Sequence, residues 1–206
     1  MLDSVDEVDW KLLQGCYETA EEMPNFLRAL LSPSAKVRAW GLEEVMSAVW
    51  HQGTVYEVSA AVIPFLYELI ECDGVPDKGD IADIVATVAN GHSYLEVHVR
   101  TPDDVAVWES IHAKTGRTLA TELAKELGHV AAAKQMVLKR LDVLYPYLLD
   151  PDPGVRGAVA QAVGCFPEVV ARLLPDLEAA MRDELHEYPL AVLERVVEAG
   201  RARRCN

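Results

Sequence analysis

An internal repeat constrains the fold of this chain more than any other feature of its sequence. The pattern Leu-Leu-x-Pro-x-x-x-Val-Arg occupies residues 30–38 and returns at residues 148–156, a constant offset of 118 residues. In both copies an apolar helical segment ends before the proline, and an apolar stripe at helical spacing begins with the valine. A turn that is used twice between helices predicts a chain built from helix pairs.

Four prolines extend this pattern along the chain. Pro24, Pro64, Pro102 and Pro146 each lie at the start or in the first half of an expected helix, and their spacings are 40, 38 and 44 residues. A period near 40 residues with two helices per unit is typical of an α-solenoid. Because one helix pair cannot bury its own apolar face, neighbouring pairs must stack. We therefore expect an all-α fold, an α-α superhelix of about four to five helix pairs.

Local signals place the first helix boundaries. Pro24 starts a helix, since a proline is accepted in the first turn. Ser34 can cap the next helix. A polar elbow follows at residues 51–54, where Gly53 suits the left-handed conformation past a helix end.

Residues 91–101 interrupt the helical pattern. Their apolar and polar residues alternate, which predicts an extended, irregular insertion. Helices are expected further on, over residues 118–128 and 133–149. Residues 1–206 are expected to form a single domain, since a chain of this length needs no disulfide bonds to support its core.

Composition agrees with a helical chain. Half of the 206 residues are hydrophobic and a quarter are charged, whereas only 7% are aromatic. The abundance of Ala, Val and Leu over aromatic residues favours helix over sheet. The longest apolar run, Ala60–Tyr67, is too short to span a bilayer, and the acidic segment Met1–Asp9 lacks the apolar region of a signal peptide. We therefore expect a cytoplasmic protein that does not bind membranes.

The net charge of −14 limits the classes of partner. It argues against nucleic acid, because phosphate binding needs clustered Lys and Arg. It fits a basic protein partner, because opposite fields steer association. An acidic cluster near the N-terminus either contacts such a partner or forms a solvated face. The cluster comprises Asp3, Asp6, Glu7, Asp9, Glu18, Glu21 and Glu22.

Cysteine and histidine spacing gives no sign of a metal site. Cys16, Cys72, Cys165 and Cys205 are scattered without a C-x-x-C pair, and no histidine lies at ligand spacing from any of them. Free thiols are therefore a better prediction than a disulfide framework or zinc. Without a glycine-rich phosphate loop in the sequence, no cofactor is expected.

The repeated turn resembles that of HEAT repeats. In that family a proline kinks the first helix, Asp or Ser begins the turn, and Val-Arg opens the second helix. The match is good at residues 24–50 and 146–165, partial at 64–90, where Asp80 stands at the Val-Arg position, and poor at 102–132.

Residues 51–66 are also similar to a group of bacterial HEAT-repeat proteins without an assigned activity. The resemblance implies a solenoid of bacterial origin that binds other proteins along one face. It also implies that Arg38 and Arg156 pair with a turn aspartate, and Asp152 is the candidate partner for Arg156.

Two groups of polar residues are candidate binding sites. His51, Gln52 and Tyr56 lie at the elbow between repeats, and Gln52 and Tyr56 share a face if the following helix starts early. The alternative is that His51 and Gln52 satisfy backbone groups at a helix end while Tyr56 packs against Trp50.

The second group lies on the insertion. His92, Tyr94, His98 and Arg100 would point to the same side of an extended segment. With Asp103 and Asp104 nearby, such a segment would allow a general base or an anion site. A loop that is structural or contacts a partner is the alternative.

Two classes of function remain open. The first is a non-catalytic protein-interaction module that presents an acidic curved surface, such as an immunity or antitoxin-like protein that masks a basic toxin, or a regulatory protein. The second is an enzyme or small-ligand-binding protein that uses the concave face with His51, Tyr56, His92 and His98. The sequence has no nucleophile–base motif. We therefore favour the first class and predict no catalytic residue. The partner, the binding face and the oligomeric state stay open.

Overall fold

The computed structural model describes residues 1–17 and 19–204, so Glu18 and Cys205 of the sequence predictions lie outside the described residues. The fold is all-α, as expected. The α-helices are α1 (Met23–Ala29), α2 (Ala35–Val49), α3 (Glu57–Glu71), α4 (Lys78–Ala89), α5 (Tyr94–His98), α6 (Pro102–Ala113), α7 (Leu119–Lys139), α8 (Pro153–Gly164), α9 (Pro167–Asp183) and α10 (Glu187–Arg204). The shorter elements are the 3-10 helices η1 (Val5–Glu7), η2 (Trp10–Leu12) and η3 (Leu141–Leu149) and the strands β1 (Trp50–His51) and β2 (Thr54–Val55).

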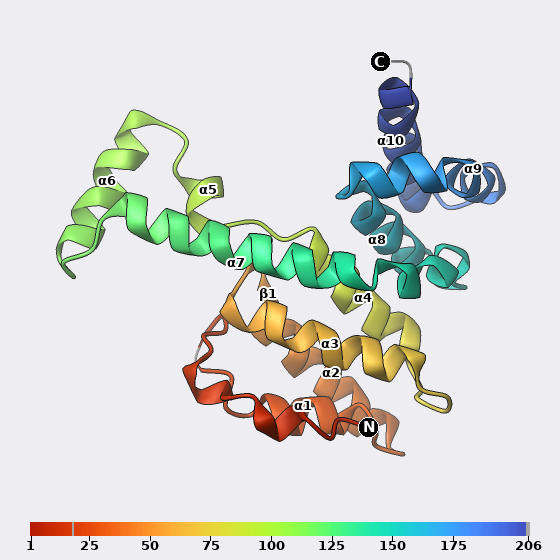
Figure 1. Ribbon diagram of the computed structural model, residues 1–206, viewed down its shortest axis with the longest axis horizontal. Coiled ribbons are helices and arrows are strands. Elements are labelled where there is room, and N and C mark those ends of the chain that lie inside the picture. The colour runs from red at the N-terminus through yellow and green to blue at the C-terminus, as the bar shows by residue number, and fades with distance from the viewer. Residues whose placement is uncertain (18, 205–206) are drawn as a thin grey trace.

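The body of the protein is a succession of packed helices (Figure 1). α1 packs against α2, α3 packs against α4 and α7, α4 packs against α8, and α10 packs against both α8 and α9. One apolar core runs through these helices, from Leu2 near the N-terminus to Val197 in α10. No helix in residues 1–17 and 19–204 is both long enough and apolar enough to cross a membrane.

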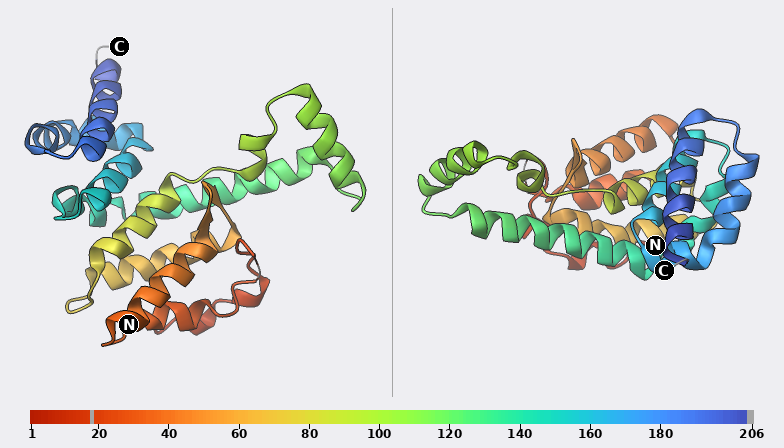
Figure 2. Two further views of the ribbon diagram at one scale, coloured as in Figure 1. Left: turned by 180° about the vertical axis from the view of Figure 1, so that it is seen from behind. Right: turned by 90° about the horizontal axis from the view of Figure 1, so that it is seen from above.

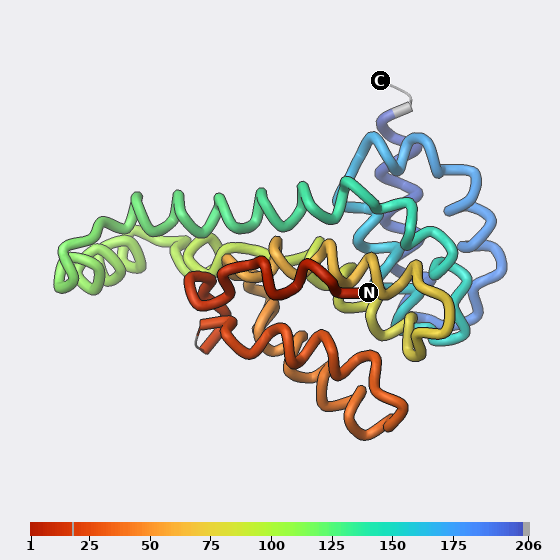
Figure 3. Tube along the Cα trace, turned by 60° about the horizontal axis from the view of Figure 1, so that its bottom comes forward, coloured from red at the N-terminus to blue at the C-terminus, as the bar shows by residue number. Residues whose placement is uncertain are grey.

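One segment projects from this body. α5, α6 and the first half of α7 form an arm (residues 94–128) that extends past the other helices (Figures 2 and 3). No residue of α6 is buried, and the apolar core has no member in residues 90–129. The start of α5 is held to α7 by Glu126, whose carboxylate accepts hydrogen bonds from Ser93 Oγ at 2.7 Å and Leu95 N at 2.8 Å.

Two sequence predictions for the arm are wrong. Residues 94–98 form a helix where the alternation predicts an extended segment, because Ser93 caps this helix by accepting a hydrogen bond from Glu96 N at 3.1 Å. α7 runs from Leu119 to Lys139 without the break that the sequence predicts between residues 128 and 133, and the end of the second predicted helix is the 3-10 helix η3. Gly128 lies at an exposed position within α7, where a single glycine lowers helix stability without ending the helix.

The polar elbow after α2 is a β-hairpin. β1 and β2 pair antiparallel, and the two turn residues Gln52 and Gly53 have φ angles of +49° and +91°. Two consecutive positive φ angles are those of a type I′ turn, whose twist matches that of the strands. Gly53 therefore has the left-handed conformation expected of it, but it lies between strands and not at a helix end.

The two copies of the repeated turn make the same contacts. Arg38 Nη1 donates to Ser32 O at 3.1 Å and to Pro33 O at 3.3 Å. Arg156 Nη1 donates to the equivalent oxygens, Asp150 O at 2.7 Å and Pro151 O at 3.1 Å. Arg38 also pairs with Asp77 at 2.5 Å, and Arg156 pairs with Glu184 at 2.6 and 2.8 Å. The prediction that Asp152 pairs with Arg156 is wrong, because Asp152 caps α8 by accepting from the backbone N–H two residues on, at 2.7 Å.

Candidate functional site

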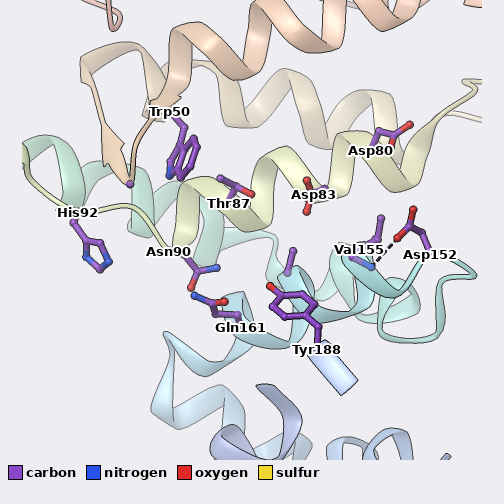
Figure 4. A pocket seen from close by; sticks show the side chains of 13 residues that line it. Trp50, Asp80, Asp83, Thr87, Asn90, His92, Asp152, Val155, Gln161 and Tyr188 are labelled. Carbon is purple, nitrogen blue, oxygen red and sulfur yellow. Dashed lines mark hydrogen bonds between the residues drawn. The ribbon is translucent and has the colours of Figure 1, made fainter. Parts of the chain in front are cut away.

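A groove of about 540 Å³ lies between α4 and α8 (Figure 4). We call it the α4–α8 groove. The hairpin contributes to its lining on one side, and Tyr188, near the start of α10, contributes on the other. Its lining residues with polar side-chain groups are Trp50, Asp80, Asp83, Thr87, Asn90, His92, Asp152, Gln161 and Tyr188.

α4 supplies one wall of the groove. Asp80, Asp83, Thr87 and Asn90 follow one another at spacings of three, four and three residues, which places them on one face of the helix. The buried residues of α4 are all apolar and belong to the core. The amphipathic pattern of the helix therefore leaves its polar stripe facing the groove.

Three aspartates make one end of the groove acidic. Burial, followed by the charges of Asp80 and Asp152, raises the pKa of Asp83 to about 6. Burial also raises the pKa of Asp80. Within the described part of the chain, neither Asp80 nor Asp83 has a hydrogen-bond or ion-pair partner, and neither Lys nor Arg lines the groove. A cation that enters would favour the charged form of these carboxyl groups.

The other end of the groove is lined by amide and aromatic side chains. Asn90 is fixed there, because its Nδ2 donates to Ala86 O at 2.9 Å and its Oδ1 accepts from Cys165 Sγ at 3.1 Å. The side chains of Gln161 and Tyr188 have no hydrogen-bond partner among residues 1–17 and 19–204. The groove therefore offers free donors and acceptors beside its carboxylates.

The hairpin and the segment after α4 are joined by backbone hydrogen bonds. His92 N donates to Gly53 O at 2.7 Å, and His92 O accepts from Val55 N at 3.2 Å. This approach requires glycine at position 91, because a Cβ at Gly91 would lie 2.1 Å from Val55 Cγ1. The hydrogen bonds bring Trp50 and His92 to the same groove.

The first group of predicted site residues does not line the groove. His51 Nδ1 lies within hydrogen-bond distance of Tyr17 OH, at 3.1 Å, and the two rings are in edge contact. Gln52 is a turn residue of the hairpin. Tyr56 is the N-cap residue of α3, and burial raises its pKa. Only their neighbours in the hairpin reach the groove.

The structure separates the second group. His92 lines the groove, whereas Tyr94 and His98 stack on each other in α5 with ring centroids 4.0 Å apart. Arg100 precedes α6, and its backbone N donates to Asp104 Oδ2 at 3.1 Å. The predicted alignment of all four side chains is wrong, because a helix takes the place of the extended segment.

Sequence reasoning missed the acidic end of the groove. The available signal was the polar stripe in residues 80–90, but such a stripe equally predicts a solvated helix face. Only the packing of α4 against α8 turns this face into a groove wall. No group of Asp, Glu, His and Cys side chains in the described residues has the arrangement of a metal site.

Comparison with known proteins does not assign the groove. No family model matches the chain, and neither does any curated protein or solved structure. Function therefore has to be argued from the groove itself.

Proposed function

We propose that this protein is a non-catalytic binding module that holds a basic segment of a protein partner in the α4–α8 groove. The observation that carries this proposal is the acidic end of the groove. Asp80, Asp83 and Asp152 lie there without a Lys or Arg in the described lining, in a chain with a net charge of −14. Asp83 is half-buried and has no partner among the described residues, and such a carboxylate attracts a cationic side chain more strongly than a solvated one does.

The same proposal includes a HEAT-like solenoid in a bacterial cytoplasm. The repeated Arg38 and Arg156 contacts support related helix pairs, since both arginines bind the turn of their own pair and the loop before a later helix. Two kinds of partner fit an acidic groove: a basic toxin that this protein would mask, and a basic target that it would regulate. The two differ only in the identity of the partner.

The geometry favours a binding module over an enzyme. The catalytic alternative needs the predicted His and Tyr residues within reach of one substrate. Of these residues only His92 lines the groove, while His51 contacts Tyr17 and His98 lies in the arm.

The Asp83→Asn variant tests the groove. With a fluorescently labelled peptide of five Arg-Gly repeats in about 0.15 M salt, we expect the variant to bind about tenfold more weakly than the wild type, because a half-buried carboxylate is lost. Asp176→Asn is the matched control, since Asp176 is exposed on α9 and outside the groove lining. Fluorescence anisotropy titrations measure both. Equal losses in the two variants would show that net charge, and not the groove, binds the peptide.

The same variant is expected to stabilise the fold at neutral pH. The pKa of Asp83 is raised from 3.8 to about 6, so its carboxyl group costs stability increasingly as pH rises from about 4 through 6. Asp83→Asn removes that cost and should raise the free energy of unfolding by about 1–2 kcal/mol at pH 8, and by less at pH 5. Urea unfolding at both pH values measures this. A variant that is less stable than the wild type at pH 8 contradicts the assigned environment of Asp83.

A further inference from the structure

Tyr188 has an unusual position for a half-exposed tyrosine. Its ring lies directly on α8 at Gly157, where a Cβ would lie 2.3 Å from Tyr188 Cε1. The residue remains 54% exposed, and its side chain borders the groove in Figure 4, with its hydroxyl group toward the side of Asn90 and Gln161. More than half of the residue is thus accessible to a ligand.

The loop just before Tyr188 and α10 is held in place by α8. The carboxylate of Glu184 accepts two hydrogen bonds from Arg156, at 2.6 and 2.8 Å. It also accepts from the backbone N–H groups of Leu185 and His186, at 3.0 and 2.9 Å. The Glu184 side chain is only 3% exposed, and its hydrogen bonds with Arg156 lower its pKa to about 2. Two neighbouring residues of α8, Arg156 and Gly157, therefore position the loop and receive the ring.

We propose that the α4–α8 groove selects arginine side chains over lysine side chains, and that Tyr188 is the residue that determines this specificity. The inference rests on the proposed function. A guanidinium group is planar, stacks on aromatic faces and donates several N–H groups in fixed directions, whereas an ammonium group is a strongly hydrated point charge. The groove offers contacts of both kinds to an arginine-rich segment: the ring of Tyr188 and the free amide of Gln161 at one end, and carboxylates at the other.

Three labelled peptides with five repeats of Arg-Gly, Lys-Gly or citrulline-Gly test the proposal on the full chain. Citrulline keeps the shape of arginine without its charge. We expect the arginine peptide to bind about fivefold more tightly than the lysine peptide, because of cation–π and stacking contacts, and the citrulline peptide to bind most weakly. Tyr188→Leu should lower arginine-peptide affinity to that of the lysine peptide, while Tyr188→Phe should keep the preference.

Each outcome separates this inference from the proposed function. Equal affinities for the arginine and lysine peptides in the wild type, with both weakened by Asp83→Asn, overturn the specificity inference and leave the binding module standing. A preference for arginine that survives in Tyr188→Leu overturns the role of Tyr188. If neither cationic peptide binds, the proposed function and the inference fail together.

Gly157→Ala provides a second test that keeps the tyrosine in the chain. The new methyl group would displace the ring from α8, so the ratio of arginine to lysine affinity should fall from about five to near one. Circular dichroism confirms that the fold is retained. If Gly157→Ala changed the stability but left the ratio of arginine to lysine affinity unaltered, Gly157 would have a purely structural role. That result would contradict the inference that α8 positions Tyr188 for binding.

Discussion

Arg156→Ala is expected to destabilise the protein by about 3 kcal/mol, and Arg38→Ala by only about 1 kcal/mol. The two arginines make the same contacts to their turns, but their carboxylate partners differ in burial. The Glu184 side chain is 3% exposed, whereas that of Asp77 is 33% exposed. Removing Arg156 leaves a buried carboxylate without its cation, which is far more costly than exposing a half-solvated one.

Urea unfolding of both variants measures this difference. A double variant, Arg156→Ala with Glu184→Gln, should recover part of the loss because the uncompensated charge is gone. Equal losses in the two single variants would show that burial of the partner does not decide the cost.

The cost of Arg156→Ala is also expected to depend on pH. The pKa of Glu184 is lowered from 4.5 to about 2, mainly by its hydrogen bonds with Arg156. This pairing contributes stability above about pH 4.5, and the contribution is lost as pH falls from there toward 2. The difference in stability between the wild type and Arg156→Ala should therefore shrink over that interval. Unfolding measured at pH 7 and pH 3 checks the sign.

Gly91→Ala is expected to cost about 2 kcal/mol, although it adds only one methyl group. The new Cβ would lie 2.1 Å from Val55 Cγ1 and 3.1 Å from Val55 Cβ. Val55 is 2% exposed and cannot move away freely. The variant should also weaken peptide binding, since this contact brings His92 and Trp50 to the groove.

Gly128→Ala is the matched control for that variant. Gly128 lies within α7 and is exposed, and its added Cβ would meet nothing within 4 Å. The same substitution should therefore stabilise the protein by about 0.5–1 kcal/mol, through helix propensity alone. Thermal melting compares the two. Similar effects of both substitutions would contradict the tight approach of Gly91 to the hairpin.

The helical framework could be predicted because its signals are local. Pro24 lies in the first turn of α1, and Ser34 directly precedes α2. The stripe that begins at Val155 is buried in α8 as expected. The capping pattern Ser93-x-x-Glu96 was also present and would have predicted α5. The alternation of apolar residues favoured a strand instead, because five residues are too few to distinguish the strand period of two residues from the helix period of 3.6.

The groove could not be predicted because it depends on contacts between distant segments. Asp83 and Gln161 are 78 residues apart, and nothing near either one identifies the other as a neighbour. Tyr188 lies at the groove because α10 packs against α8 and because Arg156 pairs with Glu184 in the loop before α10, and these contacts are not local in sequence. The hairpin was missed for a different reason. Gln52 adopts a positive φ angle that sequence patterns assign to Asn, Asp or Gly.

The arm is expected to lose its structure before the rest of the molecule does. No residue of α6 is buried and the core has no member in residues 90–129, so opening this helix does not disturb that core. Its amide protons should exchange with solvent through local opening, at a free energy far below that of global unfolding. A protease cut between α6 and α7 would therefore leave the melting temperature of the body almost unchanged. Changes in the length or sequence of α6 should therefore leave the cooperativity of the unit that forms the groove unaltered.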